Sequence, residues 1–141
     1  MKYVVDCSTA LKSVLMEPDR AKAILLRDGF CNGLHELLAP DLFPAEVANG
    51  LLIAERRKLI GPGDGALCLA DVMQTPPFLH SAGPLLVRAY EIAHRYQRTV
   101  YDCLYVALAE REQCEFITAD IKLFNGLHPA FAFVLSLASM P

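Results

Sequence analysis

Several classes of protein are excluded by what this sequence lacks. Its five cysteines are odd in number and include no C-x-x-C pair, so zinc-ribbon and dithiol redox motifs are absent and a disulfide scaffold is not expected. The apolar tail 129–141 is shorter than the about 20 residues that span a bilayer. Asp6 interrupts the apolar N-terminal stretch too early for a signal peptide. We therefore expect a cytoplasmic protein without membrane association.

Common nucleotide-binding and phosphate-transfer motifs are also missing. There is no G-x-x-x-x-G-K-[ST] segment, and the loose G-x-G-x-x-A match at 61–66 follows a basic helix end rather than a strand. A D-x-D phosphatase would need an acid where Ser8 stands, and a receiver domain would need one at Cys7. The four histidines are scattered, without the H-x-x-x-H spacing of a metal site.

The composition nevertheless describes a well-packed globular chain. Its 141 residues allow one domain, spanning 1–141, and 54% of them are apolar, which excludes intrinsic disorder. That apolar share indicates strands covered on both faces, an interface, or both. The net charge is −3, and no polybasic segment indicates binding to a nucleic acid or a membrane.

Short apolar runs alternate with helical segments along the whole chain. This pattern predicts an α/β fold, a three-layer α/β/α sandwich with a central parallel sheet. We expect strands at 3–5, 37–40, 78–80, 115–118 and 132–137. We expect helices at 8–16, 18–28, 41–59 (capped by Asp41), 64–74, 84–96 and 102–113, and a short one from 120.

Four carboxylates stand where a charge is costly. Asp6, Glu46 and Asp102 are each the only charge in a segment that otherwise reads as core, and Asp120 directly follows a strand. The aspartates precede helices, so each taken alone is more easily explained as an N-cap. Glu46 lies inside its helix, on the row of Leu42, Asn49, Gly50 and Ile53, and capping does not explain it.

The predicted topology brings these acids to one place. The carboxyl ends of parallel strands meet at one edge of the sheet, where ligands bind at the topological switch point. Carboxylates about 5 Å apart repel by about 3 kcal/mol per pair at an effective dielectric constant of 20, so they must share protons or hold a cation. Several oxygen ligands suit Mg²⁺ or Mn²⁺, and such a site suggests phosphoryl transfer or hydrolysis.

Four segments of the sequence resemble the PIN-domain ribonucleases, and among them the VapC-type toxins. They are V-V-D-C-S-T-A-L-K at 4–12, P-D-L-F-P-A-E-V-A-N-G-L at 40–51, Y-D-C-L-Y-V-A-L-A at 101–109 and F-I-T-A-D at 116–120. The segments occur in the family's order and span most of the chain. Each is weak alone, whereas the four together are fairly specific. The resemblance implies an α/β/α fold and Mg²⁺- or Mn²⁺-dependent cleavage of RNA that leaves a 5′-phosphate and a 3′-hydroxyl.

The resemblance also assigns residues. Asp6, Glu46, Asp102 and Asp120, the acidic quartet, match the family's catalytic and metal-binding acids. Ser8 and Thr118 match its hydroxyl positions, which orient acids or bind a phosphate. Where some members carry a further acid, this chain has Lys122, with Asn125 as a weak substitute, so one-metal catalysis is an alternative to two. The resemblance further implies a homodimer and an antitoxin partner whose C-terminal segment covers the acidic cleft.

The main hypothesis is therefore an endoribonuclease of a toxin–antitoxin pair. Two other functions remain open: a metal-dependent phosphohydrolase acting on small phosphate esters, and a catalytically inactive binding module with the same fold. Removing the four site acids leaves 12 acids against 13 basic residues, a balance compatible with RNA. The candidate phosphate contacts are Lys12, Arg56, Arg57, Lys58 and Lys122, although the run 56–58 also suits a helix C-terminus.

Overall fold

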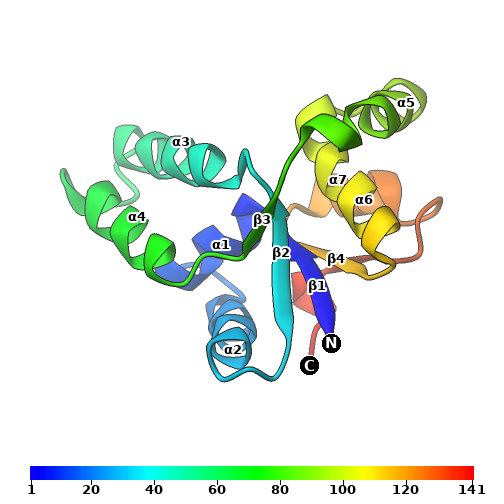
Figure 1. Ribbon diagram of the computed structural model, residues 1–141. Helices are drawn as coiled ribbons and strands as arrows, with labels where there is room; N and C mark the ends of the chain where they lie inside the picture. The colour runs from blue at the N-terminus through cyan, green and yellow to red at the C-terminus, as the bar shows by residue number, and fades with distance from the viewer.

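Five short strands form one parallel sheet at the centre of the protein, described over residues 1–141 by a computed structural model (Figure 1). The strands are β1 (Lys2–Val5), β2 (Glu36–Pro40), β3 (Phe78–His80), β4 (Glu115–Thr118) and β5 (Val134–Ser136). The helices are α1 (Cys7–Val14), α2 (Arg20–Cys31), α3 (Phe43–Arg56), α4 (Asp64–Gln74), α5 (Leu86–Tyr96), α6 (Val100–Glu112) and α7 (Ile121–Leu127). Two 3₁₀ turns complete the chain, η1 (Gly83–Leu85) and η2 (Leu137–Ser139).

Helices cover both faces of the sheet, as Figure 1 shows with the sheet nearly edge-on. Helices α1 to α4 lie on one side, and α5, α6 and α7 lie on the other. The predicted three-layer α/β/α architecture with a central parallel sheet is therefore confirmed.

The strand order is β3-β2-β1-β4-β5, so the chain changes direction across the sheet between β1 and β4. These two strands pair in parallel, with Val5 opposite Ile117. The next residues along each strand, Asp6 and Thr118, therefore meet at the carboxyl edge of the sheet. This is the switch point at which ligand sites form in such folds.

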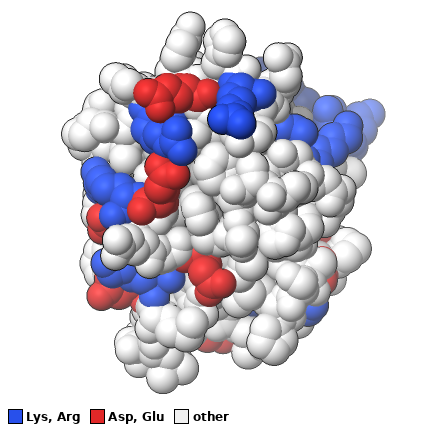
Figure 2. All heavy atoms as spheres, turned by 90° about the vertical axis from the view of Figure 1, so that its right-hand side faces the viewer, with Lys and Arg blue, Asp and Glu red and all other residues white.

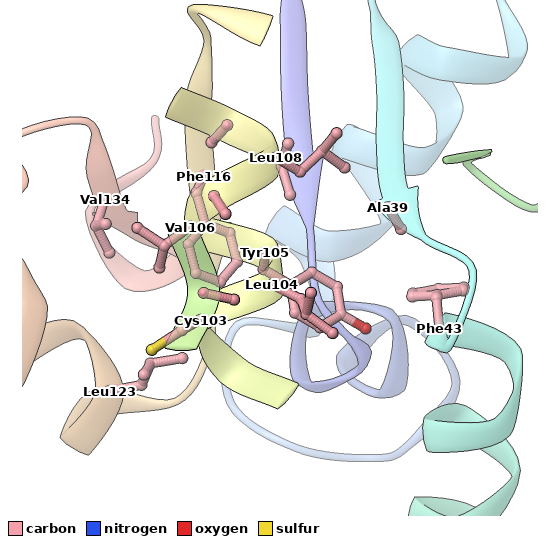
Figure 3. Close-up of a cluster of buried hydrophobic side chains, with 14 of the residues drawn as sticks. Ala39, Phe43, Cys103, Leu104, Tyr105, Val106, Leu108, Phe116, Leu123 and Val134 are labelled. Atoms are coloured by element: carbon pink, nitrogen blue, oxygen red, sulfur yellow. The ribbon is translucent and has the colours of Figure 1, made fainter. Parts of the chain in front are cut away.

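The sheet separates two apolar clusters because strand side chains alternate between its faces. Val4, Leu38 and Phe116 face the larger cluster, which includes the buried residues 103–109 of α6 (Figure 3). Tyr3, Leu37 and Ile117 face the smaller cluster, beside α2 and η2. Helix α6 is thus buried on nearly all sides, which explains why Asp102 has no charged neighbour in the sequence around it.

Several predicted element boundaries are wrong. Helix α2 begins at Arg20 rather than at Pro18, because Asp19 adopts a left-handed backbone conformation with φ of 68°. Helix α3 spans Phe43–Arg56 and is not capped by Asp41, whose Oδ1 accepts a hydrogen bond from the backbone N–H of Ala82 at 3.3 Å. Helix α1 ends earlier than expected, α5 follows a 3₁₀ turn that contains Pro84, α6 begins before Asp102, and β5 is shorter.

The helices of the fold are also too short or too polar to cross a bilayer.

Candidate active site

Asp6 lies between β1 and α1, and three hydrogen bonds fix its carboxylate in place. Oδ1 accepts hydrogen bonds from the Ser8 hydroxyl at 2.6 Å and from the Thr9 backbone N–H at 3.1 Å. Oδ2 accepts one from the Thr118 hydroxyl at 2.6 Å. Asp6 therefore does cap α1, as the alternative interpretation held, but it also makes contacts that a cap does not require. A carboxylate offers about four acceptor positions, so about one remains free for a ligand.

The charge on Asp6 is costly in this position. The side chain is only 6% exposed. Burial raises the pKa of Asp6 from 3.8 to about 6, and the negative charge of Asp102 adds to the increase. The hydrogen bonds from Ser8, Thr118 and Thr9 oppose it without cancelling it. Asp6 thus has an ordered carboxylate that favours a bound proton or cation.

Two hydroxyl groups tie the first strand to the fourth. Thr118 Oγ1 is buried, donates to Asp6, and accepts the backbone N–H of Asp120 at 3.1 Å. Ser8 Oγ similarly donates to Asp6 and accepts the backbone N–H of Ala119 at 3.0 Å. The two roles implied for Ser8 and Thr118 were orienting an acid or binding a phosphate. In this structure both hydroxyls orient Asp6.

Asp120 lies just beyond β4, on the same edge of the sheet. Its Oδ1 accepts the backbone N–H of Leu123 at 3.1 Å and so caps α7. The residue itself is exposed. Its second carboxylate oxygen has no protein partner and is available to a ligand.

Asp102 is the third residue of α6 and is not the helix cap. Thr99 is the cap, and its hydroxyl accepts the backbone N–H of Asp102 at 3.1 Å. The carboxylate is half-buried and lies beside the Thr99 side chain. Burial raises the pKa of Asp102, as does the negative charge of Asp120, whereas the Thr99 side chain and the positive charge of Arg98 lower it. The capping interpretation is therefore wrong for Asp102, whose own backbone N–H is capped by Thr99.

Glu46 approaches from α3 and is held by a residue that the sequence analysis missed. Tyr105 on α6 donates its hydroxyl hydrogen to Glu46 Oε1 at 2.6 Å. The tyrosine is 2% exposed and stacks against Phe116, and its hydroxyl (red in Figure 3) points out of the apolar cluster. Burial raises the pKa of Glu46, and so does the charge of Asp102. The sequence did hold a signal, since Tyr105 supplies the first polar side-chain oxygen after Asp102 in a buried helix.

Electrostatics links all four acids through Asp102. Its charge raises the pKa of Asp6 and of Glu46, and Asp120 in turn raises the pKa of Asp102. The side chains do not form a ready-made metal cage, since no three Asp, Glu, His or Cys residues are close enough to share one ion. The donor set still fits Mg²⁺ or Mn²⁺, because a Mg²⁺ ion commonly binds through one or two carboxylates and keeps several waters.

The predicted basic contacts are scattered rather than gathered at this site. Lys12 is paired with Glu17 at 2.5 Å. Arg56 ends α3, about 15 Å along the helix axis from Glu46, and Arg57 and Lys58 follow it. They suit the helix C-terminus, as the alternative interpretation held. Lys122 and Asn125 are exposed on α7, the helix that Asp120 caps, and Asn125 makes no side-chain hydrogen bond.

Comparisons with known proteins agree with the motifs. The profile of the PIN domain family matches residues 3–125. Ribonuclease VapC9 of Mycobacterium tuberculosis is 33% identical over 113 residues, which cover 78% of this chain and 87% of that protein. Ribonuclease VapC3 of Pyrobaculum aerophilum is 33% identical over 125 residues, covering 87% and 92%. The crystal structure of PAE2754 from Pyrobaculum aerophilum superposes with a TM-score of 0.65 at 22% identity, covering 98% of this chain and 93% of that one.

Proposed function

The chain belongs to the PIN-domain family, and from this premise we propose that residues 1–141 form one Mg²⁺- or Mn²⁺-dependent endoribonuclease domain, the toxin of a toxin–antitoxin pair. The observation that carries the proposal is the placement of Asp6, Glu46, Asp102 and Asp120. The four acids come from separate segments, and the charge of Asp102 raises the pKa of Asp6 and Glu46, while the charge of Asp120 raises that of Asp102. The names of the VapC relatives supply the reaction, hydrolysis of RNA.

Each acid has a role that follows from its surroundings. Asp6 offers a fixed, nearly buried oxygen and Asp102 a half-buried carboxylate in the first turn of α6, so these two hold the cation directly. Glu46, positioned by Tyr105, and the free oxygen of Asp120 hold or orient water around it. When bound, the ion lowers the pKa of a water molecule and stabilises negative charge on the phosphate under attack.

The surface of the protein also offers an apolar patch on which a partner could pack. Exposed apolar side chains gather on α5 and at the start of α6: Leu86 (47% exposed), Val87 (75%), Tyr90 (64%) and Tyr101 (64%). Figure 2 shows the face formed by α5, α6 and α7, where a broad area lacks charged residues beside a band of alternating acidic and basic ones. We propose that this apolar patch is the homodimer interface, while an antitoxin covers the acidic cleft.

One comparison of substrates tests the proposed activity. The purified chain should cleave a single-stranded RNA oligomer in Mg²⁺, should stop when EDTA is added, and should leave 5′-phosphate ends. It should not hydrolyse p-nitrophenyl phosphate. Hydrolysis of the small ester with intact RNA would favour a phosphohydrolase. Inactivity on both substrates, with a correctly folded chain and Mg²⁺ present, would favour the binding module.

A further inference from the structure

A groove of about 590 Å³ opens beside Asp102. It lies between the end of α5 and the first turn of α6, and it is lined by Ala93, His94, Gln97, Arg98, Thr99 and Asp102. Its volume is within the range of small-ligand sites, and five of its six lining residues are polar or charged. A polar groove that includes one of the quartet acids is placed to receive part of a substrate.

Arg98 in this groove differs from the other half-buried arginines. Arg20 donates to the Ser13 carbonyl and Arg27 donates to Asp71 and Thr75. Arg98 has no side-chain partner, and its Nε is the one buried side-chain nitrogen or oxygen atom in the chain without a hydrogen bond. Its two terminal nitrogens also lack partners and reach solvent. A desolvated donor without an acceptor is costly, so it indicates a ligand that the protein itself does not provide.

The position of the guanidinium depends on a glycine. Gly126 of α7 lies directly beneath it, and a Cβ at that residue would stand 2.7 Å from Nε and 2.6 Å from Cζ of Arg98. Any side chain at 126 would therefore displace the arginine. Gly126 lies inside a helix, where alanine is normally more stable. Here the glycine leaves room for the guanidinium of Arg98 against α7, the helix that follows Asp120.

The chemistry of the ligand follows from its neighbours. Arg98 lowers the pKa of Asp102, yet no ion pair joins the two side chains, so the guanidinium is near the carboxylate without being used by it. Positive charge would then lie on two sides of the groove: a cation at Asp102 on one side, and the guanidinium of Arg98 on the other. The planar guanidinium fork matches the non-bridging oxygens of a phosphate. Resting on the proposed nuclease function, we propose that Arg98 is a positioning residue that binds a backbone phosphate of the RNA beside the cleavage site.

Three variants and one control test this role. Arg98→Gln removes the charge, Arg98→Lys keeps the charge without the fork, and Gly126→Ala keeps Arg98 but displaces it. Arg95→Gln is the control, because Arg95 is an exposed arginine near the end of α5, three residues before Arg98 and outside the groove. The measurements are Kd for a fluorescein-labelled single-stranded RNA in EDTA, its salt dependence, KM and kcat in Mg²⁺, and the melting temperature.

We expect Arg98→Gln to raise Kd and KM by about tenfold, the scale of a lost charge-assisted hydrogen bond. It should also reduce the slope of log Kd against log salt concentration by about 0.7, the value for one phosphate of a single strand. Arg98→Lys should keep that slope but recover only part of the affinity. Gly126→Ala should weaken RNA binding while its melting temperature stays equal or rises.

The possible failures are distinguishable. Wild-type RNA cleavage with Kd and KM in Arg98→Gln no different from those in Arg95→Gln would overturn the role of Arg98 and leave the nuclease proposal intact. Normal binding by Gly126→Ala would overturn the argument that the arginine must lie over α7. A folded wild type that neither binds nor cleaves RNA would overturn the proposed function, and this inference with it.

Discussion

Asp6→Asn should stabilise the metal-free protein while abolishing its activity. Burial raises the pKa of Asp6 from 3.8 to about 6, which corresponds to about 3 kcal/mol of lost stability at neutral pH. Asparagine removes the charge, and its carbonyl still accepts from Ser8 and Thr9, but its amide cannot accept from Thr118. The lost hydrogen bond reduces the gain to about 1–2 kcal/mol, or a rise in melting temperature of about 3–8 °C for a chain of this size.

The pH dependence identifies the cause. Between about pH 4 and pH 6 the native state binds a proton at Asp6 that the unfolded state has released. Stability contributed by this group therefore falls as the pH rises through that interval and levels off above it. The advantage of Asp6→Asn over the wild type should accordingly be largest above about pH 6 and should disappear near pH 4. Mg²⁺ should raise the melting temperature of the wild type and not that of the variant.

Thermal unfolding followed by circular dichroism in EDTA, repeated from about pH 4 to about pH 8, measures this difference. Asp28→Asn is a matched control, because Asp28 is exposed on α2 and its side chain makes no hydrogen bond. It should show no such dependence on pH. A melting temperature for Asp6→Asn below that of the wild type at neutral pH, or an advantage that persists unchanged near pH 4, would refute the electrostatic reasoning.

Four further outcomes are expected. Glu46→Gln should keep or raise the melting temperature in EDTA, since the glutamine carbonyl still accepts the hydrogen bond from Tyr105. Its RNA cleavage should slow by at least about tenfold. A large loss of stability with normal turnover would instead make Glu46 a structural residue. Tyr105→Phe should raise the pKa of Glu46 further and slow cleavage, seen as an acidic limb of the pH–rate profile displaced to higher pH. Thr118→Val should raise the pKa of Asp6 above about 6, and nuclear magnetic resonance titration of that carboxyl in EDTA would detect the change. Val87→Glu should convert a dimer to a monomer in light scattering at micromolar concentration, and a wild type that is already monomeric would count against the interface.

Much of the fold could be predicted because its determinants are local. The β-branched run before Asp6 and the short apolar segments between helices indicate buried parallel strands, and every predicted strand exists. Helix starts were less accurate. Asp41 has the right chemistry to cap α3, but its carboxylate instead bonds to Ala82, a residue remote in sequence. A contact of that kind overrides a local preference and leaves no trace in the nearby sequence.

Charge placement located the acidic residues but not what surrounds them. A lone carboxylate in an apolar segment is visible in the sequence, and the structure brings Asp6 and Asp120 to the ends of neighbouring strands. The partners could not be predicted in the same way. Tyr105 gives only the weak signal of one polar oxygen in a buried helix, and Arg98 resembles the other basic residues close to helix ends. Their roles depend on packing between helices, which residue spacing does not encode.

The bond between Asp6 and Thr118 joins residues 112 positions apart, and this has a consequence for the making of the protein. Ribosomes produce the central strand β1 first, but its neighbour β4 and the acids Asp102 and Asp120 come only in the last third of the chain. A nascent or prematurely terminated chain therefore carries Asp6 and Glu46 without the rest of the site. Such long-range pairing also slows folding. The proposed RNA-cutting site is therefore complete only after Asp120 has been synthesised and β4 has paired with β1.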